Sequence, residues 1–237
     1  MSSLSDILGL DGTEDFQHID QEWDLIGLKQ QNFHPVIVLP ENYEVFDFSE
    51  GYDPERNLKY PYGIGKYNEH RPTMYEGEQF HYETSLHQRT VHIGVDIAAP
   101  AQTEIYAFEK GVVYAVGNND LPYDYGPTLI TKHRIQHLEI YALFGHVSTS
   151  VLTKWSPGDL FEKGEVLTQV GSKMENGGWN PHLHFQLSRV APKNYDLPGK
   201  SNQAISNSFW LQSFIRNKIF CCGTIFTSNH GRSLAEI

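Results

Sequence analysis

The sequence is poor in cysteine and in basic residues, and these two shortages exclude several classes of protein. Its only cysteines, Cys221 and Cys222, are adjacent, so they supply no disulfide framework and lack the spacing of zinc ligands. Only 18 Lys and Arg residues stand against 29 Asp and Glu residues, which gives a formal net charge of -11. A protein of that sign repels a phosphate backbone, so we expect no nucleic-acid partner.

Long apolar runs are also missing. No stretch approaches the ~18 apolar residues that a membrane-spanning helix needs. The first residues, MSSLSDILGLDGTEDF, show no basic region followed by an apolar run. We therefore expect no membrane span and, by default, a cytoplasmic location, with export by another route left open. The 39% hydrophobic and 13% aromatic content of the 237 residues suffices for a full hydrophobic core.

Three regions of the chain differ in character. Residues 1–75 are acidic and rich in turn residues, which predicts an irregular extension packed on the core. Residues 76–190 hold short β-rich segments with no long helical pattern between them, which predicts a mostly β fold with an antiparallel sheet. Within them, Gly111 in EKGVV and Gly164 in EKGEV are typical of tight hairpins. Residues 191–237 are predicted as a loop followed by an amphipathic helix over SFWLQSFIRNKIF.

Histidine and carboxylate side chains first meet in the stretch HIGVD. His92 and Asp96 are four residues apart, which along a flat strand is about 13 Å. That distance is too long for two ligands of one metal ion with bonds of ~2.0 Å. The strand must bend if both bind the same ion, and Gly94 lies where a bend is easiest.

Two later stretches add three more histidines. FGHVS places His146 at the end of an apolar strand, where its side chain would point into a cleft. NPHLHFQLS places His182 and His184 on one face of a strand, about 6.5 Å apart, which suits one imidazole binding a metal while the other faces the metal's water or the substrate. Two buried imidazoles without partners are costly, so a functional role is favoured. The isolated His133 and His137 are interpreted as surface or hydrogen-bonded residues.

Taken together and in this order, HIGVD, FGHVS and PHLHF resemble the M23 family of zinc metallopeptidases, the lysostaphin-like or LytM-type domain. The resemblance covers about residues 89–188. It implies the lysostaphin/LytM (duplicated hybrid motif-like) type of β fold and one Zn²⁺ per chain. It also implies an endopeptidase that uses a metal-activated water to hydrolyse short, small-residue peptide bonds, those of peptidoglycan cross-bridges or stem peptides. The resemblance makes His92, Asp96 and His184 the metal ligands and His146 and His182 the catalytic residues, with the choice of general base left open.

The sequence departs from the family pattern at two places. Many members have Tyr and Leu where FGHVS has Phe144 and Val147, which are conservative changes. ENGGWNP stands where members often carry a loop like Gly-Ser-Thr-Gly, so Trp179 and Asn180 are expected to border the substrate groove and to affect specificity. YGIGKYNEHRPTMY and DYGPT are similar to M23-like modules of large intracellular proteins, which lack a signal peptide.

Two other functions stay open at this point. One is a zinc hydrolase or amidase acting on an intracellular peptide or metabolite, and the other is a latent, non-catalytic module of the same fold. Latency would need a side chain in the open coordination position. The sequence offers five candidates, although loop or rim positions are favoured for them: Asn68, Glu69, His70, His81 and His87. The sequence makes no prediction of the oligomeric state.

Overall fold

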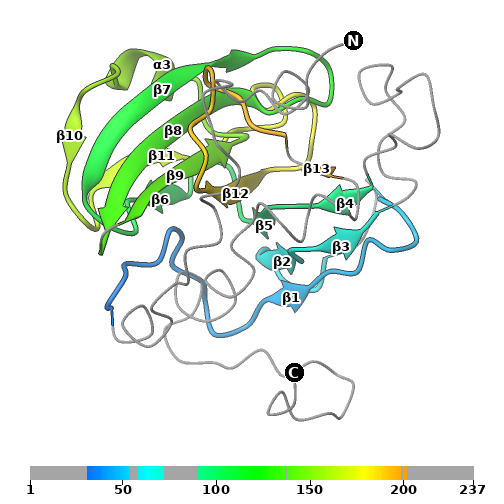
Figure 1. Ribbon diagram of the computed structural model, residues 1–237. Helices are drawn as coiled ribbons and strands as arrows, with labels where there is room; N and C mark the ends of the chain where they lie inside the picture. The colour runs from blue at the N-terminus through cyan, green and yellow to red at the C-terminus, as the bar shows by residue number, and fades with distance from the viewer. Residues whose placement is uncertain (1–30, 54–57, 72–89, 137, 199, 202–237) are drawn as a thin grey trace.

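A single eight-stranded sheet dominates the computed structural model, which describes residues 31–53, 58–71, 90–136, 138–198 and 200–201 (Figure 1). The strand order of this sheet is β1-β2-β5-β12-β9-β8-β7-β10. A two-stranded sheet, β11-β6, and a three-stranded sheet, β13-β4-β3, accompany it. Within the described residues the longest strands are β7, β8 and β9, which form the curved part of the sheet at the left of Figure 1.

The bounds of the described elements are β1 Glu44–Val45, β2 Gly63–Gly65, β3 Glu69–His70, β4 Val91–His92, β5 Val95–Ala98, β6 Glu104–Tyr106, β7 Gly111–Asn119, β8 Gly126–Ile135, β9 Leu138–Gly145, α3 Val151–Lys154, β10 Leu160–Phe161, β11 Val166–Gln169, β12 His182–Ser188 and β13 Lys200–Ser201.

The strand pairings confirm the predicted mostly β fold with an antiparallel sheet. Among the pairings of the described strands, only β1 with β2 is parallel. The predicted hairpins at Gly111 and Gly164 are wrong. Gly111 is the first residue of β7, which follows β6, and Gly164 lies between β10 and β11. In each case the two strands belong to different sheets. Gly164 does lie in a turn, but a turn does not determine whether the strands on its two sides pair.

The N-terminal region contributes strands to the sheet, which its irregular sequence does not predict. β2 pairs with β5, with Gly65 opposite Asp96, and β1 extends the same edge. β3 pairs with β4, so His70 lies opposite Val91. Figure 1 shows these short strands beside β5, at the opposite edge of the assembly from β10. Strands of two or three residues are too short for alternation to reveal them.

The hydrophobic core lies against both faces of the long strands. Phe185 of β12 packs on Phe144 and Phe108, with ring centroids 5.2 and 5.8 Å apart.

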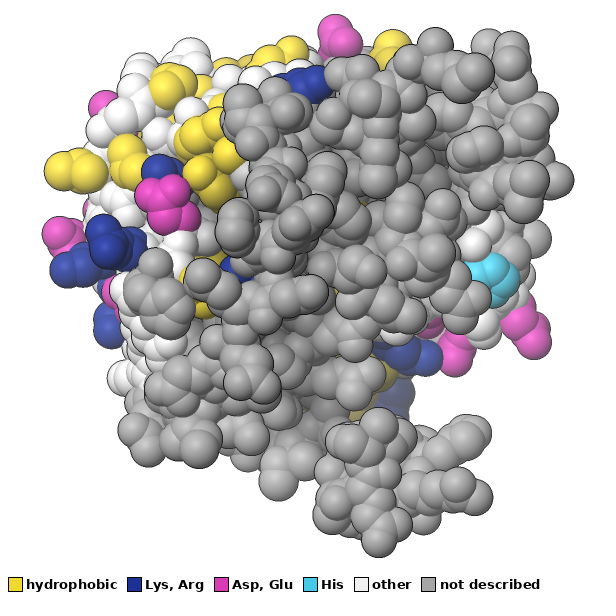
Figure 2. Space-filling view, viewed as in Figure 1, with side chains coloured by type: hydrophobic (Ala, Val, Ile, Leu, Met, Phe, Trp, Pro, Cys, Tyr) yellow, Lys and Arg dark blue, Asp and Glu magenta, His cyan; other side chains and the backbone are white. Residues whose placement is uncertain are grey.

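Figure 2 shows Lys and Arg side chains beside Asp, Glu and hydrophobic ones on the described part of one face. No helix among the described residues is long and apolar enough to cross a membrane. The predicted C-terminal amphipathic helix lies outside the described residues, as do Cys221 and Cys222.

Candidate functional site

Three neighbouring strands bring the predicted site residues together. β12 lies between β5 and β9 in the sheet. His184 on β12 is opposite Asp96 on one side and Gly145 on the other. His146 therefore follows directly after the strand residue that faces His184. The register joins motifs that are separated by tens of residues in the sequence.

The bend that the HIGVD spacing requires is present at Gly94. The chain leaves β4 after His92, bends at Gly94 and enters β5 at Val95, so that the two strands belong to different sheets. A Cβ atom at Gly94 would lie 2.3 Å from Cε1 of His184. The backbone of Gly94 is not in the left-handed region. Glycine is thus required here because the His184 ring packs directly on the backbone, rather than for an unusual φ.

The side chains of His92, Asp96 and His184 converge on one point. Nε2 of His92 lies 3.1 Å from Nδ1 of His184, and Oδ1 of Asp96 lies 3.2 Å from the first nitrogen and 3.0 Å from the second. All three residues are buried, and their donor atoms form the one group of three or more candidate metal ligands found among the described residues. The arrangement is a nearly equilateral triangle of two nitrogens and one oxygen.

This triangle fits a tetrahedral zinc ion. Zinc bonds to imidazole and carboxylate are ~2.0–2.2 Å long, which places tetrahedral ligands about 3.3 Å apart. Two imidazoles and one carboxylate are also the composition typical of catalytic zinc sites, which keep one position open. Burial, with the Arg71 charge, lowers the pKa of His92 to about 4, so the ring is neutral at pH 7, as a metal ligand must be.

The second nitrogen of each ligand imidazole is held by a polar partner. Nδ1–H of His92 donates to the carbonyl oxygen of Lys66 over 3.0 Å. Nε2–H of His184 donates to Oε1 of Gln186 over 3.1 Å. Such contacts set the tautomer and the ring orientation, so they aim Nε2 of His92 and Nδ1 of His184 at the shared point.

Asp96 is held by a buried ion-pair network. Nη1 of Arg71 donates to Oδ2 of Asp96 over 2.7 Å, and Nε of Arg71 donates to Oε2 of Glu69 over 2.8 Å. Glu69 also accepts the backbone N–H of Phe48 at 3.0 Å. Burial by itself raises the pKa of Asp96, but His92 and Arg71 hold it well below its usual range. The carboxylate is therefore ionised, with Oδ2 on Arg71 and Oδ1 facing the two imidazoles.

His146 and His182 lie beside this triangle with their rings 4.2 Å apart. Nδ1–H of His146 donates to the carbonyl of Asn176 over 3.0 Å, and Nδ1–H of His182 donates to the carbonyl of Asn180 over 2.7 Å. Both rings therefore direct Nε2 away from the backbone. Burial lowers the pKa of both imidazoles, and for His146 the neighbouring His182 and His184 lower it further.

The backbone at His146 is unusual, because its φ is 61°, in the left-handed region. Its N–H donates to the carbonyl of Tyr125 over 2.9 Å, and its carbonyl accepts from Gly171 over 3.0 Å. A non-glycine residue in this conformation is uncommon and persists only where its surroundings hold it in place. The surrounding loops thus fix the direction in which the His146 ring points.

Comparison with protein families gives a match to Peptidase family M23 over residues 90–197. Residues 90–197 form an M23 family peptidase domain. The match confirms the family that the motifs resemble, and it contains the three candidate ligands and both further histidines. Comparison with curated proteins gave no significant match.

Several solved structures are similar to the chain that carries this M23 domain. One is a zinc-containing peptidase from Vibrio cholerae, at 23% identity and a TM-score of 0.35 over 49% of this chain and 34% of that one. This chain thus spans about a third of the length of the Vibrio cholerae protein. A catalytic-domain mutant of the prophage-encoded M23 protein EnpA from Enterococcus faecalis is 22% identical, with a TM-score of 0.41 over 60% of this chain and 92% of that one. The catalytic domain of lysostaphin from Staphylococcus simulans is 19% identical, with a TM-score of 0.36 over 50% and 80%.

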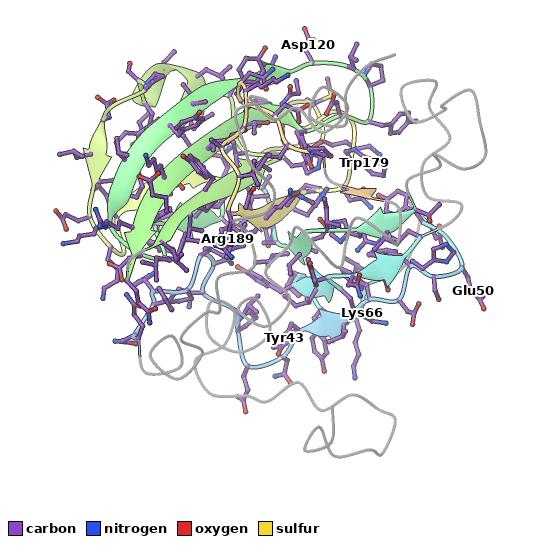
Figure 3. The ribbon with its side chains drawn as sticks, in the orientation of Figure 1. Tyr43, Glu50, Lys66, Asp120, Trp179 and Arg189 are labelled. Carbon is purple, nitrogen blue, oxygen red and sulfur yellow. The ribbon has the colours of Figure 1, made fainter. Side chains whose placement is uncertain are left out.

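A cavity of about 300 Å³ opens beside this triangle of candidate metal ligands, and Trp179, Asn180, Asp96 and His182 are among its lining residues. Most of the wall is apolar. Figure 3 shows Trp179 on the side of the molecule where β12 begins. Its ring stacks edge-on against Tyr52 and against Tyr123, each with centroids 5.3 Å apart. Trp179 and Asn180, which are expected from the sequence to border a substrate groove, thus both line a cavity, and their role there stays a prediction.

Three of the candidate latency residues lie in the described part of the chain, and they take other positions. Glu69 is buried against Arg71, and His70 is exposed. The backbone N–H of Asn68 donates to the carbonyl of His92. Neither Glu69 nor His70 belongs to the ligand group of the described residues. His81, His87 and His137 lie outside the described residues, and His133 is buried and hydrogen-bonded.

Sequence reasoning missed the residues that hold the ligands in place. Gln186 continues the every-second-residue pattern of His182 and His184, so alternation along the strand could have identified it. No sequence pattern points to Arg71 or to the carbonyl of Lys66. Lys66 is labelled in Figure 3. Both residues come from the region predicted to be an irregular extension, and only its packing against β4 and β5 brings them to the site.

Proposed function

We propose that this M23 domain is a zinc-dependent endopeptidase whose metal ligands are His92, Asp96 and His184. The observation that carries the proposal is the buried triangle of donor atoms, 3.0–3.2 Å apart, with two further histidines beside it. A zinc ion in this triangle would polarise the scissile carbonyl and lower the pKa of a water toward ~7. The substrate that the family resemblance implies is a peptide of peptidoglycan, from its cross-bridge or its stem.

His146 and His182 are proposed as the catalytic residues. Each has its Nδ1–H bound to a carbonyl, which leaves Nε2 to accept a proton from the attacking water or, once protonated, to donate to the developing oxyanion or the leaving amine. His182 is only half-buried and borders the cavity, whereas His146 is buried. The substrate therefore approaches from the side of His182.

The site is tested by metal analysis combined with peptide digestion. Purified protein is expected to bind one zinc per chain and to cut peptidoglycan fragments or synthetic peptides, as detected by mass spectrometry. His146→Ala and His182→Ala are each expected to lower kcat/KM by about 10²–10⁴-fold with zinc retained. His184→Ala is expected to lose the zinc as well.

The matched control is His133→Ala, which removes a buried imidazole that faces Phe108 rather than the metal site. It is expected to reduce stability without changing the zinc content or kcat/KM of the folded fraction. Full zinc occupancy with no hydrolysis of any peptide would contradict the proposed function and favour a non-catalytic module. Cleavage of small cytosolic peptides or modified amino acids alone would favour the hydrolase or amidase alternative.

A further inference from the structure

The cavity beside the metal site has a wall of unusual composition for an enzyme that cuts bonds between small residues such as glycine. Aromatic rings of Phe46, Phe48, Tyr52 and Trp179 line it together with Leu58 and Pro181. Its volume of about 300 Å³ is at the lower end of ligand pockets, enough for one large side chain and too small for a long segment. Glycine has no side chain to place there.

The rings of the aromatic wall pack against one another and against Arg71. Phe46 and Phe48 are buried, with rings 5.5 Å apart, and Phe48 contacts Tyr52 with centroids 6.2 Å apart. The guanidinium of Arg71 lies 4.7 Å from the centre of the Phe48 ring. The same arginine holds the metal ligand Asp96. Arg71 therefore contacts the aromatic wall of the pocket through Phe48 and the metal site through Asp96.

The pocket is also continuous with the catalytic groups. Asp96 and His182 belong to its lining, and Ala98, opposite His182 on β5, forms part of its floor. A peptide whose scissile carbonyl sits at the metal site would thus place a neighbouring side chain over this opening. Apolar walls favour an uncharged side chain, because a charged one would lose its hydration there, and the Asp53 carboxylate that also lines the pocket repels an acidic one.

We propose that this pocket is a specificity subsite for a bulky apolar side chain, such as Leu or Phe, next to the bond that is cut. The inference rests on the proposed function, and it narrows the substrate from any short, small-residue peptide to one with a large apolar residue on one side of the scissile bond. Filling the pocket is expected to raise kcat/KM about ten- to hundredfold over the matched glycine peptide.

The test is a positional scan of quenched peptides around a Gly-Gly core, in which each position is replaced in turn by Leu, Phe or Asp. A single position is expected to prefer Leu and Phe over Gly and to reject Asp. Leu58→Asp places a carboxylate at the rim of the pocket, where Leu58 is 46% exposed, and is expected to reduce the Leu/Gly ratio at least tenfold. Leu160→Asp, at an 80% exposed position on β10 away from the pocket, should leave that ratio unchanged.

Failure of the subsite is distinguishable from failure of the proposed function. Equal cleavage of the glycine and leucine peptides, or an unchanged ratio in Leu58→Asp, would overturn the subsite and leave the peptidase intact. If no peptide is cut, binding of N-acetyl-leucine amide and N-acetylglycine amide to the zinc-loaded protein is measured by isothermal titration calorimetry. Tighter binding of the leucine compound, weakened by Leu58→Asp, supports the pocket without catalysis, and equal or absent binding overturns it.

Discussion

Arg71 and Asp96 form a buried ion pair, with Nη1 of the guanidinium 2.7 Å from Oδ2 of the carboxylate. Twenty-five residues separate them in the chain, and both side chains are largely removed from solvent. The pair occupies Oδ2, which leaves Oδ1 to face the imidazoles of His92 and His184. Arg71 is thus a positioning residue for a proposed ligand.

Arg71→Met is expected to weaken zinc binding about ten- to hundredfold, as the loss of contacts to metal ligands generally does. In the metal-free protein it leaves the Asp96 carboxylate buried without its cation, whereas Glu69 keeps Lys66, whose Nζ lies 3.5 Å from Oε1. The free energy of unfolding is therefore expected to fall by about 3–5 kcal/mol. Chelator competition measures the affinity and urea unfolding measures the stability. Arg71→Lys keeps the positive charge but loses the planar guanidinium that bonds Asp96 and Glu69 at the same time, so an intermediate zinc affinity is expected.

The control for this variant is Lys132→Met, which removes an exposed ion pair with Glu139 at 2.7 Å. Surface pairs of this kind contribute about 0–1 kcal/mol, so both zinc affinity and stability should stay near those of the parent. Zinc affinity in Arg71→Met equal to that in Lys132→Met would show that Arg71 does not act on the ligand.

Gly94→Ala is expected to abolish zinc binding. The added methyl group would lie 2.3 Å from the ring of His184, so this ligand must move. Gly117→Ala is the matched control, because its methyl group would meet the ring of Tyr195, a 36% exposed side chain that is able to swing aside. Zinc content by atomic absorption, with circular dichroism to confirm folding, separates the two. Full zinc in Gly94→Ala would mean that His184 is not a ligand.

Glu175 joins the loop before Trp179 to the segment after His146. Its carboxylate accepts hydrogen bonds from Ser148, Thr149 and Ser172. Burial raises its pKa, but the hydrogen bonds from Ser172 and Thr149 outweigh burial and lower it to about 2. Asn176, the next residue, holds Nδ1–H of His146.

Glu175→Ala is therefore expected to reduce kcat/KM about tenfold or more while zinc content is unchanged, because the three proposed ligands lie on other segments. Peptide cleavage and metal content are measured on the same preparation. The exposed Glu162→Ala is the charge-matched control and should keep full activity. Zinc loss from Glu175→Ala would point to a general collapse of the site instead.

His133 predicts a pH dependence of stability that is independent of the metal site. Burial lowers its pKa to about 4, and the ring packs on Phe108 and Phe161. The unfolded chain, with a His pKa near 6.5, then binds a proton that the folded protein does not. The stability from the neutral imidazole is complete above pH ~6.5 and is lost as the pH falls toward ~4, by about 3 kcal/mol in all.

The check is the free energy of unfolding from pH 7.5 to 4.5 for the parent and for His133→Gln, both in the presence of a chelator. The parent should lose stability more steeply on acidification, so the difference between the two proteins should shrink as the pH falls. Parallel curves would show that His133 is protonated equally in both states.

Much of the site could be predicted from the sequence because its signals are local. The alternation of a strand places His182 and His184 on one face, and the four-residue spacing of His92 and Asp96 requires the bend that is seen at Gly94. The mostly β fold followed from short strands without helices between them. The hairpins at Gly111 and Gly164 were wrong because strand pairing depends on partners elsewhere in the chain.

The sequence by itself determined which donor atoms are available, their order along the chain and the family to which residues 90–197 belong. Only the tertiary structure decided that Asp96 and His184, 88 residues apart, lie 3.0 Å from each other. It also decided that Arg71 and three rings of the aromatic wall, those of Phe46, Phe48 and Tyr52, reach the site from the N-terminal region. The reason is physical: local preferences depend on near neighbours, whereas strand register and the burial of an ion pair depend on the packing of the whole chain.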